Sequence, residues 1–68
     1  MEYSDRKLLP VGFSMSLAQD MQAMTNFATL PDPRKEELVQ YIENSTTGDE
    51  AKSRIGEVVS NLHYDRLS

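Results

Sequence analysis

The sequence predicts an all-α protein, a small bundle of three main helices at about residues 15–29, 33–44 and 48–63, with an irregular N-terminal leader. Apolar residues recur at three- and four-residue spacing through each of these segments, which is the helical period. Proline and capping residues mark their boundaries. The 68 residues suffice for one domain only, and the absence of cysteine excludes a disulfide that would stabilise a small core.

The domain organisation that follows is a leader over 1–13, one helical domain over 14–64 and a frayed tail over 65–68. Pro10 and Gly12 interrupt the leader, and Pro10 disfavours helical angles at the residue before it. Leu9–Phe13 is nevertheless apolar, so we expect it either to pack across the helices or to be offered to a neighbour. Met1–Lys7 is expected to be flexible.

The N-terminus also bears on localisation. Only Leu8 and Leu9 precede Pro10, whereas a signal peptide needs about 7–15 apolar residues. No apolar run approaches the roughly 20 residues of a membrane span. We therefore expect a cytoplasmic protein without a membrane segment.

The first helix is expected to start near Ser14 or Ser16, because Ser16 and Gln19 have the spacing of a capping box. Helical spacing places a set of apolar residues on one face: Leu17, Met21, Met24, Phe27, Ala28 and, closing it, Leu30. The other side is polar but uncharged: Gln19, Gln22, Thr25, Asn26 and Thr29. Asp20 is the only charge in this segment, which Pro31 and Pro33 end.

The second helix is predicted to begin with Asp32 as N-cap and Pro33 at the first helical position, where a missing N–H costs nothing. Its apolar side is made of four residues: Leu38, Val39, Tyr41 and Ile42. Residues 44–48 are rich in Asn, Ser and Thr and end in glycine, which is typical of a turn.

The third helix has the clearest start, because Thr47 and Glu50 match a capping box. Glu50 and Arg54 stand four residues apart in the favourable order. An apolar stripe runs along the helix: Ala51, Ile55, Val58, Val59 and Leu62. Gly56 lies within it, which indicates either close approach of another helix or an exposed position that tolerates glycine.

Two family resemblances add to this interpretation. The first rests on a run and its continuation: Leu9-Pro10-Val11-Gly12-Phe13-Ser14-Met15-Ser16-Leu17-Ala18, then Ala23-Met24 and Phe27-Ala28. It resembles the start of small uncharacterised helical proteins of anaerobic Firmicutes, and it covers about residues 9–62. That resemblance implies a bacterial cytosolic origin and brings no established activity.

The second resemblance rests on the spacing of Leu30, Arg34, Tyr41-Ile42, Arg54-Ile55 and Leu62. This spacing is similar to that of the C-terminal helical segment of the YdeI/OmdA-associated family. The family usually has a more basic third helix, whereas this chain has Glu50 and Glu57 there. The resemblance implies the helical layout and no catalytic residue.

Few residues suit catalysis or ligand binding. His63 is the only histidine, and it lies at the end of the third helix, where we expect solvent exposure. A general base needs an oriented partner and a pocket. Gly12 and Gly48 are isolated and form no phosphate-binding loop, and no metal-ligand spacing is present. We expect no enzyme, no cofactor, no metal site and no small-molecule substrate.

The net charge of −4 argues against nucleic acid as a partner, because such binding depends on Lys and Arg neutralising phosphates. The alternative function is a small helix-turn-helix-like DNA-binding regulator, built from the second and third helices. In that alternative Arg6, Lys7 and Arg34 contact phosphates. The third helix, however, interleaves Lys52 and Arg54 with acidic residues.

The function that remains is protein–protein interaction or homo-oligomerisation. Charged residues are depleted in interface cores, so the uncharged first helix is the candidate surface. The candidate interface residues are Gln19, Met21, Gln22, Met24, Asn26 and Phe27. Helical spacing favours a core position for Met21, Met24 and Phe27, while methionine-rich surfaces also adapt to varied partners. The sequence leaves core and interface open for them.

Overall fold

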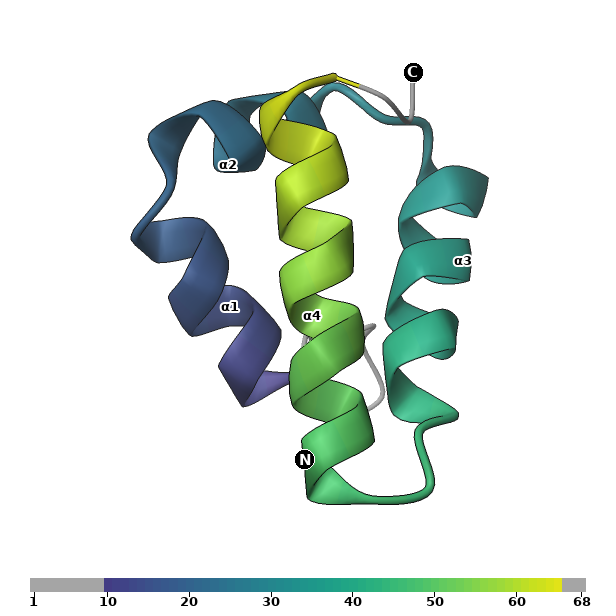
Figure 1. Cartoon of the computed structure of the whole chain (residues 1–68). Coiled ribbons are helices and arrows are strands. Elements are labelled where there is room, and N and C mark those ends of the chain that lie inside the picture. The colour runs from purple at the N-terminus through teal and green to yellow at the C-terminus, as the bar shows by residue number, and fades with distance from the viewer. Residues whose placement is uncertain (1–9, 66–68) are drawn as a thin grey trace, which may run out of the picture.

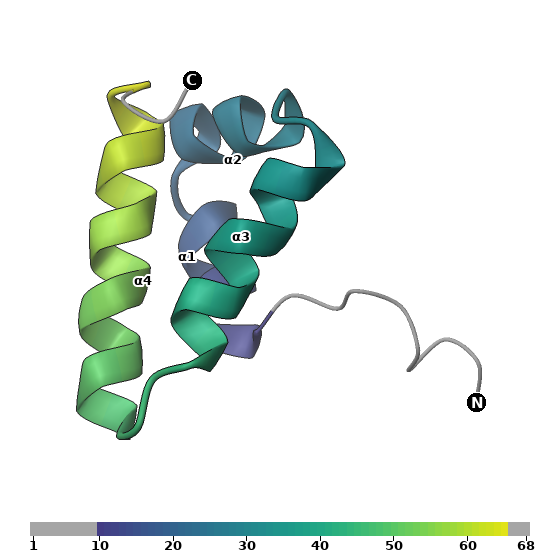
Figure 2. The same ribbon diagram turned by 90° about the vertical axis from the view of Figure 1, so that its right-hand side faces the viewer.

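A computed structural model describes residues 10–65, and these form helices joined by short connections (Figure 1). The helices are α1 Val11–Ala18, α2 Met21–Ala28, α3 Asp32–Glu43 and α4 Gly48–His63. The longest helix, α4, contacts the other three. It runs between α1 and α2 on one side and α3 on the other, and α2 lies across the end of the bundle where α4 finishes (Figures 1 and 2). The all-α class is confirmed, and the described residues contain no strand.

The prediction of three main helices is wrong, because the segment expected as one helix over 15–29 is two helices, α1 and α2. The chain breaks at Gln19 and Asp20. Asp20 has extended backbone angles (φ −134°, ψ 92°), and its carboxylate accepts a hydrogen bond from the Ala23 amide at 3.0 Å. Asp20 is therefore the N-cap of a new helix. Aspartate is favoured at this position because its carboxylate binds a free backbone amide of the first turn, which can outweigh continuing the preceding helix.

The break changes which side chains face the core. In one continuous helix Met21 and Met24 would lie on the same face as Leu17. The new start at Asp20 turns α2 about its axis, so that Ala23 and Phe27 are buried and both methionines are exposed. The predicted apolar face is consequently wrong for the methionines and for Ala28, which are exposed, and right for Leu17, Phe27 and Leu30, which are buried.

The N-terminal boundary also differs from the prediction. Helix α1 begins at Val11 with Pro10 as its N-cap, inside the predicted leader over 1–13. Ser16 lies within α1, so the predicted capping box with Gln19 does not exist. Of the apolar stretch Leu9–Phe13, Leu9 lies outside the described residues, as do residues 1–8 of the predicted leader and residues 66–68 of the predicted tail. Phe13 packs inside the bundle, whereas Val11 is exposed.

Helices α3 and α4 agree with their predicted ranges to within one residue. The N-cap of α3 is Pro31 rather than Asp32, because the carbonyl of extended Pro31 accepts hydrogen bonds from the amides of Arg34 and Lys35. The cap of α4 is confirmed, since Thr47 Oγ1 accepts a hydrogen bond from the Glu50 amide at 3.0 Å.

The core gathers apolar side chains from all four helices: Phe13, Leu17, Ala23, Phe27, Leu30, Val39, Ile42, Val58 and Leu62. The rings of Phe13 and Phe27 meet edge to face with centroids 5.4 Å apart, so the two short helices share one aromatic pair. No polar or charged residue of the described chain is buried. The core therefore depends on apolar burial alone.

One glycine marks a close approach between helices. A Cβ on Gly12 would lie 3.1 Å from Ile55 Cδ1, so α1 packs tightly on α4 at this point. Gly56, by contrast, has open space around the position of a Cβ. Of the two interpretations of Gly56, the exposed position is the one confirmed, and the close approach occurs at Gly12.

Candidate interaction surface

Exposed apolar side chains concentrate on α1 and α2. The large ones are Val11 at 74% exposure, Met15 at 57%, Met21 at 72% and Met24 at 39%. Elsewhere in residues 10–65 only two tyrosines, Tyr41 and Tyr64, are large, apolar and exposed. Burying such side chains against a partner is favourable, and gathered apolar exposure is what marks interaction sites on small proteins.

Small and neutral residues surround these side chains. Ala18, Gln22, Thr25 and Ala28 are exposed on the same two helices, and Gln19 is exposed at the C-cap of α1. Together with Val11, Met15, Met21 and Met24 they form what we call the α1–α2 surface. It contains no charged residue, so a partner could cover it without desolvating an unpaired charge, which is the costly event at an interface.

Asp20 is the only charged residue between Pro10 and Pro31, and its carboxylate is used within the chain. Besides the Ala23 amide, it contacts His63 at the end of α4, with 3.0 Å between Oδ1 and Nδ1. With Asp20 ionised, a hydrogen on Nδ1 makes this contact a hydrogen bond. The bond from His63, and after it the one from Ala23, hold the pKa of Asp20 below its ordinary value. The contact ties the α1–α2 junction to α4.

The structure divides the six predicted interface residues into two groups. Gln19, Met21, Gln22 and Met24 are exposed and belong to the α1–α2 surface. Asn26 and Phe27 face the bundle instead.

Asn26 is partly buried, and its Nδ2 donates a hydrogen bond to the Leu62 carbonyl at 2.6 Å, which ties α2 to α4. Phe27 is buried and packs on Phe13, with the Lys35 ammonium 5.8 Å from its ring centre. These two residues hold the bundle together, which removes them from the candidate surface.

Sequence reasoning missed two members of the surface, Val11 and Met15. Both lie in α1, whose start was predicted too late for Val11 to be helical. A signal was present, because Val11, Met15 and Ala18 follow one another at four- and three-residue spacing. Such a stripe opposite Phe13 and Leu17 indicates an α1 that is apolar on its outer side as well as its inner one.

A shallow groove lies beside this surface, between α1 and the first half of α4. Its lining residues are Gly12, Met15, Ser16, Gln19, Gly48, Lys52, Ile55 and Gly56. The groove holds about 550 Å³ and is open to solvent, so it can receive side chains but encloses no ligand. Its width on the α4 side follows from Gly48 and Gly56, which carry no side chain.

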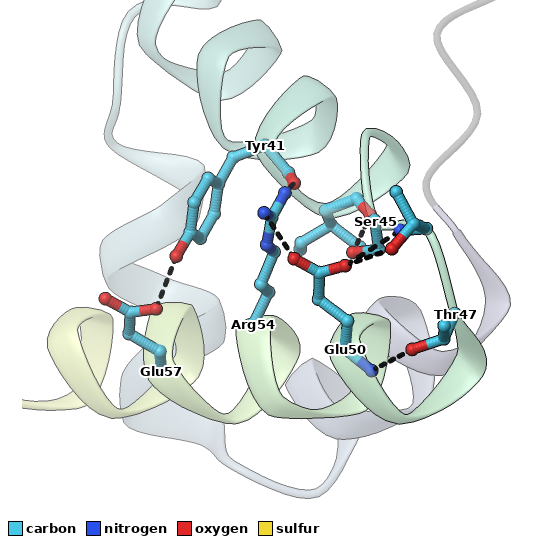
Figure 3. Close-up of polar contacts among 8 residues, drawn as sticks. Tyr41, Ser45, Thr47, Glu50, Arg54 and Glu57 are labelled. Atoms are coloured by element: carbon cyan, nitrogen blue, oxygen red, sulfur yellow. Dashed lines mark hydrogen bonds and ion pairs between the residues drawn. The ribbon is translucent and has the colours of Figure 1, made fainter.

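Polar contacts occupy the opposite side of the molecule, between α3 and α4 (Figure 3). Tyr41 donates from its hydroxyl to Glu57 at 2.6 Å, and this bond is the main cause that raises the pKa of Tyr41. Arg54 donates to the Tyr41 carbonyl and to Glu50, each at 2.7 Å. Its guanidinium also lies 4.6 Å from the Tyr41 ring centre. Charged groups here bind one another.

Glu50 connects this network to the turn before α4. Its Oε1 accepts hydrogen bonds from the amide and the hydroxyl of Thr46, at 2.9 and 2.8 Å. These two bonds are the main causes that lower the pKa of Glu50. The reciprocal half of the predicted capping box therefore falls on Thr46 rather than Thr47.

His63 ends α4 beside the junction of α1 and α2. The ring is exposed, as expected from its position, but it is paired with Asp20 and packed edge-on against Tyr64. Over residues 10–65 no three His, Asp or Glu side chains come together in a way that would hold a metal ion. None of the helices that the structure describes combines the length and the apolar character needed to cross a bilayer.

Comparison with known proteins yields no match: no family model, curated protein or solved structure resembles this chain significantly. The geometry of the described helices is therefore the basis for any functional proposal.

Proposed function

We propose that this chain is a non-catalytic interaction module of the bacterial cytoplasm, which binds a protein partner or further copies of itself through the α1–α2 surface. The observation that carries the proposal is the gathering of Val11, Met15, Met21 and Met24 on two helices that contribute no charge to the surface.

The free energy gained by burying the exposed apolar side chains indicates what kind of partner fits. Scaled by their exposures, burial of these four side chains is worth roughly 4–7 kcal/mol, at about 1.5–3 kcal/mol for each fully buried side chain. The entropy cost of association is of order 4–15 kcal/mol. A partner must therefore contribute apolar surface of its own, which favours another protein with a matching neutral surface.

The DNA-binding alternative receives no comparable support from the described helices. Helices α3 and α4 run in opposite directions and draw apart from the turn that joins them toward the end where α2 lies (Figures 1 and 2), whereas the helices of a helix-turn-helix cross at about 90–120°. Arg54, a basic residue of the would-be recognition helix, is bound to Glu50 and Tyr41. The α1–α2 surface is the better candidate.

Photo-crosslinking tests the proposal. A photo-crosslinking amino acid replaces Met21 in one version of the full chain and the exposed Gln40 of α3 in the control. Each purified version is irradiated alone and in an extract of the cells from which the gene comes. Products from position 21 that are absent from position 40 are expected. Equal products, or none from position 21, would contradict the proposal.

A further inference from the structure

We propose that the partner of the α1–α2 surface is a second copy of this chain, and that in a two-fold dimer Met15 of each copy occupies the groove between α1 and α4 of the other. This inference rests on the proposed function and narrows it to one occupant.

Shape is the first argument. Met15 is 57% exposed and lines the groove together with Gly12, Ile55 and Gly56. A protruding apolar side chain and an apolar depression thus adjoin each other on one surface. Such a surface is self-complementary, because a two-fold axis beside Met15 brings each protrusion to the other copy's depression, as isologous interfaces require.

The second argument comes from the two glycines of α4 that line the groove, Gly48 and Gly56. Gly56 costs helix stability relative to alanine, and apart from its own turn of helix none of the described residues lies within 4 Å of where its Cβ would be. Gly48 is equally open. Packing within one copy therefore does not require glycine at these positions. A second backbone or side chain seated in the groove does, because close approach needs small residues.

Charge is the third argument. The chain carries a net charge of −4, so two copies repel each other through most of their surfaces. The α1–α2 surface contributes no charge to that repulsion. The only charged residue that lines the groove is Lys52. This part of the molecule is where two copies meet at the lowest electrostatic cost.

Sedimentation velocity of the full chain over a roughly hundredfold range of concentration tests the pairing, because dimer formation follows mass action. A monomer–dimer equilibrium is expected. Gly56→Gln fills the groove with a better helix former, so the variant should raise the dimer dissociation constant at least ~tenfold. At a concentration where both proteins are monomeric, its melting temperature should equal or exceed that of the unchanged chain. Ser53→Gln, on the same helix but outside the groove, is the matched control and should leave the dissociation constant unchanged.

Cysteine cross-linking tests the orientation, because the chain has no cysteine of its own. Equal amounts of Met15→Cys and Gly56→Cys are mixed and oxidised, and a disulfide between the two variants is expected in excess over that formed when Ser53→Cys replaces Gly56→Cys. A monomer at every concentration overturns the proposal, as does a dimer that Gly56→Gln leaves intact. If the chain is monomeric but the photo-crosslinking residue at position 21 still forms products with a different protein, the proposal of a second copy is overturned and the proposed function stands.

Discussion

The two halves of this bundle use their surfaces in opposite ways. In the α3–α4 half, Tyr41, Glu50, Arg54 and Glu57 bind one another across the helix pair. In the α1–α2 half, the exposed side chains of the surface are apolar or uncharged, while the inner ones form much of the core. Substitutions in the polar network between α3 and α4 should therefore affect folding, whereas those on the α1–α2 surface should affect association.

The largest effect is expected inside the α1–α2 half. Phe13 is fully buried and stacks edge-on with Phe27. Phe13→Ala should lower the free energy of unfolding by about 3–5 kcal/mol, enough to unfold a domain of this size. Urea denaturation followed by circular dichroism measures it. A loss below about 1 kcal/mol would mean that α1 is not part of the core.

A smaller effect is expected in the α3–α4 half. Thr47→Ala removes the hydroxyl that accepts the Glu50 amide, and it should lower the free energy of unfolding by about 1 kcal/mol. Thr47→Ser keeps the hydroxyl and serves as the control. Equal stability of the two variants in urea denaturation would show that the cap does not operate.

The junction of the two halves should give the molecule a pH dependence. Because the pKa of Asp20 is lowered on folding, its contribution to stability is present above the unfolded pKa of about 3.9 and disappears as the pH falls through the lower folded value. The lowered pKa of Glu50 contributes to the same acid loss.

Melting temperatures between about pH 7 and pH 2 measure this dependence. Asp20→Asn should make the acid loss shallower, and His63→Gln should do so to a lesser extent, because the Ala23 amide still holds the carboxylate. If the melting temperatures of both variants fell at low pH as steeply as that of the unchanged chain, the Asp20–His63 contact would not form in solution.

The smallest effect on folding is expected on the α1–α2 surface. Met21 is 72% exposed, so Met21→Glu should change the free energy of unfolding by no more than about 0.5 kcal/mol. The same variant should abolish the association that sedimentation velocity detects, because it places a charge in the interface. A large loss of stability with Met21→Glu would place this side chain in the core and remove the contrast between the two halves.

The sequence predicts α3 and α4 well because their signals are local: Pro33 close to the start of one and the Thr47–Glu50 pair at the start of the other. The break at Asp20 is missed because Leu17, Met21 and Met24 also have the spacing of one apolar face on a continuous helix. Asp20 is a residue type that favours the N-cap, but the residues on both sides of it are also compatible with one continuous helix. Only the packing of Ala23 and Phe27 on α4 decides between the two.

The candidate surface was predicted only in part, because some of its residues depend on contacts that are distant in the sequence. Exposure of Gln19 and Gln22 follows from their polarity. Burial of Asn26 does not, since it depends on the Leu62 carbonyl, 36 residues further along the chain. The groove was not predictable, because Gly12 and Gly56 have opposite roles that only the placement of α1 on α4 reveals.

The most direct test of the account is the solvent accessibility of the methionine methyl groups, measured by NMR on the ¹³C-methyl-labelled chain with a soluble paramagnetic agent. At low concentration the methyl signals of Met15 and Met21 should be strongly broadened, and that of Met24 less so. At high concentration Met15 and Met21 should become protected as the surface is covered. Protection of Met21 already at low concentration, unaffected by Met15→Gln, would contradict the account, because it would place the methionines of α2 in the core.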